Sequence, residues 1–200
     1  MFWLEKLFLM SFIRTYLLRR FEAPRVLAHL PYLAGGSCLE IGCGYGAGAL
    51  LIKHYTGCSN LTSIDIDSIV IMKAIRYISR PPRWAKDIPT EGIEFTRNDA
   101  AHLPYHDVFF DAAFHFFVFD HIPEWRNVIT EVYRVLKPGG IYSFEDALIP
   151  DSPFLFNGFF GHIKLTETQI SNALEKVGFT VEHVEIRGKG VKRCYIVARK

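Results

Sequence analysis

The sequence lacks a cysteine pattern, a repeat and an excess of charge of one sign. Its four cysteines are spread over 200 residues without a C-x-x-C pair, so neither a zinc cluster nor a disulfide framework is expected. The formal net charge is only +2, which gives no argument for a nucleic-acid partner. These absences favour one globular domain of ordinary size with reduced thiols, as in cytosolic proteins, and no bound metal.

The apolar N-terminus also lacks the features of a membrane span or a signal peptide. After Lys6 the uncharged run from Leu7 to Ile13 covers only seven residues, whereas a spanning helix needs about twenty. Glu5 and the lack of a small-residue cleavage site argue against a signal peptide. We interpret residues 1–34 as an N-terminal helical extension that packs on the domain. Peripheral membrane contact or a homodimer through this helix are the alternatives, and the predicted location is cytoplasmic.

From residue 35 onward, strand-like and helix-like segments alternate, which indicates an α/β domain with a mainly parallel sheet. Strands are expected at 37–41, 61–65, 93–99, 110–119, 141–146, 180–186 and 194–199. Helices are expected at 46–54, 68–80, 124–136 and 166–179, the third of them closed by the glycines of K-P-G-G. The short turn R-G-K-G predicts that the last two strands form an antiparallel hairpin.

A glycine-rich turn, Gly42-x-Gly44-x-x-Ala47, joins the first predicted strand to the first predicted helix of the domain. Glycine permits a positive φ and a close approach of a ligand to the backbone, and the helix N-terminus adds free N–H groups. The spacing fits a nicotinamide dinucleotide or S-adenosylmethionine, and by itself it also fits a turn without a ligand. Gly48 is interpreted as merely part of the helix.

Three carboxylates at predicted strand ends favour one of the two cofactors. Glu40, two residues before Gly42, suits an ammonium group and would repel a pyrophosphate. Asp65 ends the second strand, where a carboxylate can accept both ribose hydroxyls. Asp99 ends the third strand, where it can accept the amine of an adenine ring. The pattern therefore favours S-adenosylmethionine, and a nicotinamide-dependent reductase remains an alternative that leaves Asp99 without a role.

Five segments then come in a familiar order over residues 38–140: L-E-I-G-C-G-Y-G-A-G, S-I-D-I-D, N-D-A-A-H-L-P-Y-H-D, F-D-H-I and E-V-Y-R-V-L-K-P-G-G. They resemble the class I S-adenosylmethionine-dependent methyltransferases of type 11, a group that includes ubiquinone and menaquinone C-methyltransferases. The resemblance implies a Rossmann-like three-layer α/β sandwich over residues 35–200. Its seven-stranded sheet would be mostly parallel with an antiparallel last strand.

The resemblance also implies the residues that contact the cofactor, which are Glu40, Gly42, Gly44, Asp65, Ile66, Asp99 and Ala100. Ile66 would pack on the adenine, and Ala100 would offer it a backbone N–H. Tyr45 could lean on the methionine part, and His115 is expected near the cofactor. Asp67 departs from the small polar residue often found in relatives, and we interpret it as a helix cap.

The catalytic residues are less defined, because methyl transfer needs a base only when the acceptor must lose a proton. His121, just beyond the fourth strand, is the candidate base, with a structural histidine that bonds a loop carbonyl as the alternative. Asp120 and Glu145 are expected near the same rim. Neither an N-P-P-Y motif nor a cysteine follows the fourth strand, which argues against nucleic-acid bases as substrates.

The acceptor side is rich in phenylalanine, both in the fourth strand and in residues 147–165, which we interpret as part of an apolar lid. The sequence thus predicts an S-adenosylmethionine-dependent methyltransferase with a small hydrophobic or aromatic acceptor, such as a quinone precursor, a lipid or a secondary metabolite. The alternative is a non-catalytic S-adenosylmethionine-binding protein with a regulatory or assembly role.

Overall fold

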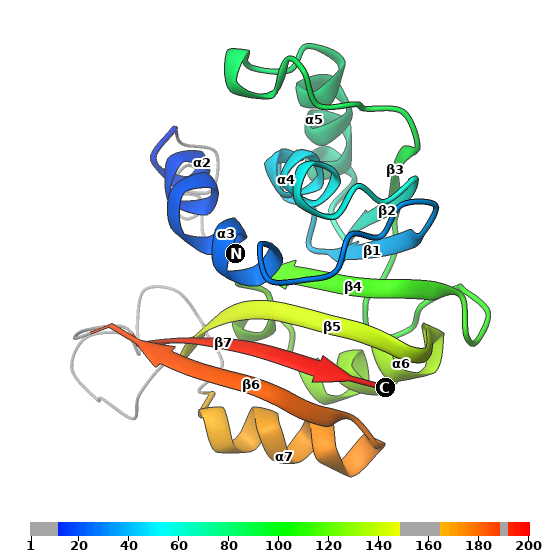
Figure 1. Ribbon diagram of the computed structural model, residues 1–200, viewed down its shortest axis with the longest axis vertical. Helices are drawn as coiled ribbons and strands as arrows, with labels where there is room; N and C mark the ends of the chain where they lie inside the picture. Colours follow the sequence, from blue (N-terminus) through cyan, green and yellow to red (C-terminus); the bar gives the residue numbers. More distant parts are fainter. Residues whose placement is uncertain (1–11, 149–164, 189–191) are drawn as a thin grey trace.

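A seven-stranded sheet with helices on both faces organises the protein (Figure 1). The computed structural model describes residues 12–148, 165–188 and 192–200. The strands are β1 (Ser37–Ile41), β2 (Asn60–Asp65), β3 (Ile93–Arg97), β4 (Phe110–Phe116), β5 (Leu136–Leu148), β6 (Thr180–Arg187) and β7 (Lys192–Arg199). The helices are α2 (Phe12–Leu17), η1 (Leu18–Glu22), α3 (Ala23–Leu27), α4 (Ala47–Thr56), α5 (Ser68–Ser79), α6 (Trp125–Val135) and α7 (Glu167–Val177), with short turns η2 (Arg83–Ala85) and η3 (Phe119–His121).

The strand order is β3-β2-β1-β4-β5-β7-β6, with β7 inserted antiparallel between β5 and β6. All other neighbouring strands pair in parallel. In Figure 1, helices α3, α4 and α5 lie on one side of the sheet, and α6 and α7 lie on the other. The predicted sandwich, its antiparallel last strand and the final hairpin are therefore confirmed. Residues 189–191 of the predicted hairpin turn lie outside the described part.

Local sequence signals explain where several helices begin. Thr166 caps α7 in a capping box with Gln169, as predicted. Asp67 caps α5, because its carboxylate accepts the N–H of Ile69 at 2.8 Å. Helix α6 is strongly amphipathic, and its apolar face buries Val128 and Val132 completely against the sheet.

The fourth strand is shorter than predicted. It ends at Phe116 rather than at residue 119, because Phe117 adopts a positive φ of 61° that no regular strand contains. The chain then forms the turn η3, which carries Asp120 and His121 past the edge of the sheet. An unbroken apolar run predicts burial but does not show where an extended backbone stops.

The sequence predicts that the K-P-G-G segment closes helix α6, but the structure shows that it does not. Helix α6 ends at Val135, and Leu136 is already extended with ψ at 144°. Strand β5 begins there, and its pairing with β4 shifts register between Phe110 and Ala112. Gly139, with φ at 77°, allows this irregularity.

The described N-terminal helices pack on the sheet domain. Ala23, Val26 and Leu27 of α3 are at most 1% exposed and share a core cluster with Leu51 and Ile52 of α4. The division of the chain at residue 34 stays a prediction, but the helices before it share the core of the domain. Within the described ranges, no helix combines the length and the apolarity needed to cross a bilayer.

Replacing Leu27 by alanine should destabilise the whole domain by about 2–5 kcal/mol, because a fully buried side chain would leave a cavity. The control Ile13→Ala, at a residue that is 61% exposed, should change the free energy of unfolding by less than about 0.5 kcal/mol. Urea denaturation measures both. An effect of Leu27→Ala as small as that of the control would show that α3 is not part of the folding core.

Candidate functional site

A cavity of about 550 Å³ opens at the carboxyl ends of the central strands. This volume lies within the usual range for small-molecule pockets, about 300–1,000 Å³. It also lies where β1 is flanked by β2 and β4, the point at which the strand order reverses and ligands bind in such sheets. Its lining includes nine of the ten predicted site residues, namely Glu40, Gly42, Gly44, Tyr45, Asp65, Ile66, Asp99, Ala100 and His121.

The glycine-rich turn forms one wall of this cavity. Gly42 and Gly44 have φ values of 73° and 49°, which side chains disfavour. A Cβ on Gly42 would come within 2.6 Å of the Val118 side chain, so that position has no room for one. A Cβ on Gly44 would meet no atom within 4 Å, because this residue faces the open cavity. A ligand can therefore lie directly against the backbone of Gly44.

The carboxylate of Glu40 is buried at the base of the turn, with the residue only 1% exposed. Ser63 of β2 donates a hydrogen bond of 2.6 Å to its Oε2 atom. Burial, with a further contribution from the charge of Asp65, raises the pKa of Glu40 to about 8. A Cβ on Gly48 would collide with Oε1, so Gly48 makes room for this carboxylate. Gly48 lies within helix α4, as predicted, but it also has a role that the sequence did not predict, since it leaves space for the Glu40 carboxylate.

Two further carboxylates lie at the rim. Asp65 accepts the N–H of Asp67 at 3.0 Å, and its burial raises the pKa of the carboxyl group. Asp99 accepts the N–H of Ala101 at 2.9 Å and lies 3.1 Å from the Nδ1 atom of His102. Both contacts lower the pKa of Asp99, and the hydrogen bond from the Ala101 backbone contributes more than the contact with His102. Asp99 is thus an ionised acceptor at neutral pH.

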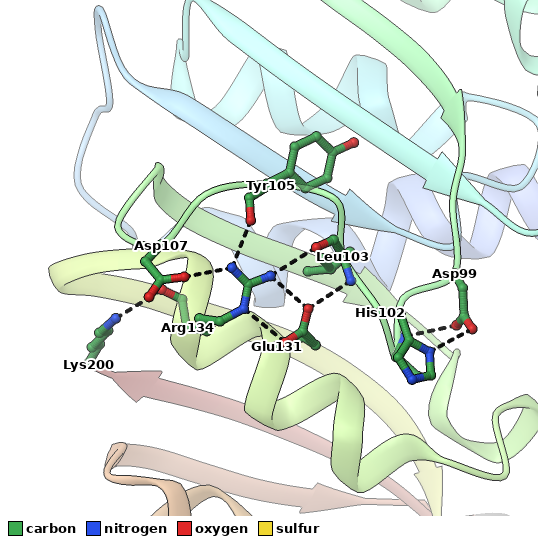
Figure 2. A network of polar contacts seen from close by, with 9 residues as sticks. Asp99, His102, Leu103, Tyr105, Asp107, Glu131, Arg134 and Lys200 are labelled. Carbon is green, nitrogen blue, oxygen red and sulfur yellow. Dashed lines mark hydrogen bonds and ion pairs between the residues drawn. The ribbon is translucent and has the colours of Figure 1, made fainter.

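Figure 2 shows how the loop that carries Asp99 is fixed. Arg134 of α6 donates to the carbonyl oxygens of Leu103 and Tyr105 and also pairs with Asp107 and Glu131. Glu131 in turn accepts the N–H of Leu103 at 2.8 Å. A planar guanidinium with several donors can hold a loop in this way. The segment E-V-Y-R, residues 131–134, thus holds the loop that carries Asp99, the residue predicted to contact the adenine.

His121 reaches the cavity from the turn η3, with its side chain 29% exposed. Its Nε2 atom lies 3.7 Å from Oδ1 of the buried Asp120. The partly open position leaves the imidazole accessible to a small molecule, as a general base requires. Asp120 itself is 5% exposed and does not line the cavity.

Two other predictions fail for geometric reasons. His115 is fully buried between β4 and β5, where it bonds Tyr142 and Asp146, and it does not line the cavity. Glu145 is also fully buried, rather than on the rim, and pairs with Arg25 at 3.2 Å. Burial raises the pKa of Glu145 to about 7. A sequence pattern alone does not reveal which strand face points to the cavity.

The N-terminal helices contribute cavity residues that the sequence did not predict: Arg14, Thr15 and Leu18. Arg14 pairs with the buried Glu22 at 2.5 Å, and its guanidinium lies 5.3 Å from the ring centroid of Phe117. These residues match no motif, so only the packing of the helices shows their role. All four cysteines are buried free thiols, as expected for core positions.

A family model described as a methyltransferase domain matches residues 39–144, which include the glycine turn, the rim carboxylates and Arg134. The chain belongs to this methyltransferase domain family. Membership implies S-adenosylmethionine as the cofactor, in agreement with the resemblance drawn from the sequence. The ubiquinone and menaquinone subgroup remains a prediction.

Similar proteins support the same assignment. Over 136 residues the chain is 30% identical to sterol 24-C-methyltransferase of Schizosaccharomyces pombe, covering 64% of this chain and 34% of that protein. Over 114 residues it is 32% identical to phthiotriol/phenolphthiotriol dimycocerosates methyltransferase of Mycobacterium tuberculosis, covering 57% of this chain and 38% of that protein. The chain thus spans little more than a third of these two curated relatives.

Among solved structures, an S-adenosylmethionine-dependent methyltransferase of Methanosarcina mazei superposes with a TM-score of 0.68 at 25% identity. The match covers 84% of this chain and 94% of that one. The cavity fits the cofactor in three respects: a buried carboxylate, a bare glycine backbone beside it, and acids at the end of β2 and shortly after β3.

Binding of S-adenosylhomocysteine should release close to one proton at pH 7. With a pKa of about 8, Glu40 is about 90% protonated in the free protein at this pH, and an ammonium group beside it favours the carboxylate. The affinity should therefore rise between about pH 6 and pH 8. Calorimetry in buffers of different ionisation enthalpy counts the protons.

In the control Glu40→Gln this proton release should vanish. Equal proton release by the variant and the unmodified protein would show that Glu40 does not face the ammonium group.

Proposed function

We propose that the protein transfers a methyl group from S-adenosylmethionine to a small lipophilic acceptor. The observation that carries this proposal is a single cavity whose lining combines two kinds of surface. One part consists of carboxylates and bare glycine backbone, and the other consists of apolar side chains from η1, from the end of β4 and from the chain that follows it. These apolar residues are Leu18, Phe116, Phe117, Val118 and Ile122.

In this proposal the carboxylates and the glycine turn hold the cofactor, which supplies a methyl group activated on a sulfonium. Glu40 would face the ammonium group, and Asp65 would accept the ribose hydroxyls. Asp99 would accept the adenine amine, with Ile66 against the ring; Ile66 is 65% exposed and available for such packing. Further contacts are assigned to Gly42, Gly44, Tyr45 and Ala100.

The apolar side chains of the lining would exclude water and hold the acceptor in line with the methyl group. His121 would take a proton from an acceptor that must lose one. The names of two relatives, a sterol methyltransferase and a phthiotriol methyltransferase, support a lipophilic acceptor. A quinone precursor fits the same wall. Most of the predicted lid, residues 149–164, lies outside the described residues.

The alternative is a protein that binds S-adenosylmethionine without turnover and acts through its N-terminal helices. It gains some support from two observations: α2 and η1 contribute residues to the cavity wall, and α3 is buried in the core. Cofactor binding with no labelled product from any acceptor pool would favour this alternative, whereas one productive acceptor would exclude it.

Label from tritiated S-adenosylmethionine should enter a lipid extract, and little of it should enter a polar metabolite pool. Replacing His121 by alanine should reduce the transfer by about 100-fold or more if the acceptor loses a proton, while leaving the binding of S-adenosylhomocysteine intact. Scintillation counting of the extracted products measures the distribution of the label and the loss of transfer in the variant. Label found only in the polar pool would contradict a lipophilic acceptor.

We also propose that the protein contacts a membrane surface through α2 and η1. Ile13, Tyr16 and Phe21 are exposed there, by 61%, 53% and 39% respectively. Arg20 lies over the Phe21 ring at 5.6 Å, so a cation accompanies the apolar residues. Apolar side chains with neighbouring arginines suit the interface of an anionic bilayer. Contact there would place the cavity beside a source of lipophilic acceptor.

The protein should float with vesicles that contain anionic lipid and should float less with neutral ones. The double variant Ile13→Asp/Tyr16→Asp should remain in the soluble fraction, whereas Val184→Asp, at an exposed position on the edge strand β6, should float like the unmodified protein. Equal flotation of both variants would contradict contact through α2. A concentration-dependent dimer without vesicle binding would assign this surface to a second copy.

A further inference from the structure

A fully buried hydrogen-bond network connects β4, β5 and the turn that follows β4. The Oδ2 atom of Asp146 lies 3.0 Å from Nε2 of His115 and accepts the backbone N–H groups of Phe119 at 2.8 Å and Val118 at 3.4 Å. The Nδ1 atom of His115 lies 2.8 Å from the hydroxyl oxygen of Tyr142. Asp146, His115 and Tyr142 are all 0% exposed.

The carboxylate of Asp146 satisfies backbone groups that regular structure leaves over. Strand β4 ends at Phe116, and Phe117 has a positive φ. The backbone N–H groups of Val118 and Phe119 therefore have no partner in a strand. Asp146 accepts two of them, and its Oδ1 atom accepts the N–H of Ala147 at 2.9 Å. A buried carboxylate needs such donors, and a buried N–H needs such an acceptor.

His115 fixes the carboxylate from the other side. The imidazole is stacked on Phe144 with centroids 4.3 Å apart, and it contacts the ring of Phe119 at 4.4 Å. Since a carboxylate only accepts hydrogen bonds, Nε2 is the nitrogen that carries a proton toward Asp146. The histidine thus acts within the core and through Asp146, not on a ligand.

The held turn forms part of the cavity wall. Val118 packs on the glycine turn so closely that a Cβ on Gly42 would lie 2.6 Å from its side chain. Phe117, Val118 and His121 all line the cavity. A displacement of the turn would therefore move the apolar wall and the candidate base together.

We infer that Asp146, held by His115, which Tyr142 bonds in turn, is a positioning residue that fixes the turn from Phe117 to His121 against the glycine turn. The role in methyl transfer rests on the proposed function, whereas the role in holding the turn does not. Neither Asp146 nor His115 touches the cavity. Supporting side chains of this kind keep reactive groups within about 0.5 Å of their working geometry.

The test is the variant Asp146→Asn, which keeps the shape of the side chain but replaces one acceptor oxygen by an NH₂ group. Ser143→Ala is the matched control, because Ser143 is also fully buried on β5 and its hydroxyl donates to Val26, away from the turn. Hydrogen exchange of backbone amides, measured by NMR, reports on the turn directly. The amide of Leu39 in β1 serves as the reference for global unfolding.

In Asp146→Asn the Phe119 amide should exchange on the order of 100-fold faster relative to Leu39, as expected when a buried bond to a charged acceptor is lost. The control should stay within about threefold of the unmodified protein. His115→Gln keeps the carboxylate of Asp146 and should give a smaller increase in Phe119 exchange, about tenfold. This variant provides the test if Asp146→Asn does not fold. Unchanged Phe119 exchange in a folded variant, or an equal change in the control, would overturn the inference.

A second measurement separates this inference from the proposed function. Asp146→Asn should bind S-adenosylhomocysteine within about threefold of the unmodified protein but lose more than about tenfold in methyl transfer to the lipid pool. If the unmodified protein neither binds the cofactor nor transfers methyl groups, the proposed function fails, and the exchange data alone decide the role of Asp146. Equal loss of binding and transfer would show that Asp146 merely stabilises the domain.

Discussion

The buried carboxylate of Glu40 is the constraint on which the rest of the cavity depends. A carboxylate with almost no exposure is costly to ionise, and Ser63 supplies its only hydrogen bond recorded among the described residues. Its position requires a residue without a side chain at Gly48. Helix α4 thus leaves room for a carboxyl group whose ionised form becomes favourable when a cation lies beside it.

The topology explains why the other polar groups meet this acid. Because β3, β2, β1 and β4 are neighbours and run parallel, their carboxyl ends lie at one edge of the sheet. Asp65 ends β2, Asp99 comes shortly after β3 and His121 shortly after β4, so their order along the chain was enough to predict a shared cavity. Positive-φ glycines and helix caps were also readable, since Gly42 and Asp67 serve roles that few residue types can fill.

Other features could not be predicted because they depend on packing in three dimensions. His115 and Glu145 lie on apolar strands, and only the pairing of β4 with β5 shows that both are buried away from the cavity. The end of β4 depends on the backbone of Phe117, to which an apolar run gives no clue. Arg14 reaches the cavity through tertiary packing alone, so no motif could reveal it.

The central claim is that the cavity is built for the ammonium, ribose and adenine groups of S-adenosylmethionine. Calorimetric titration with S-adenosylhomocysteine tests it most directly in three proteins: the unmodified chain, Asp65→Ala and the neighbouring control Asp67→Ser, which retains a helix cap. We expect saturable binding that weakens at least about tenfold in Asp65→Ala and stays within about threefold in Asp67→Ser. Absence of binding to the unmodified protein, or equal affinity in Asp65→Ala, would contradict it.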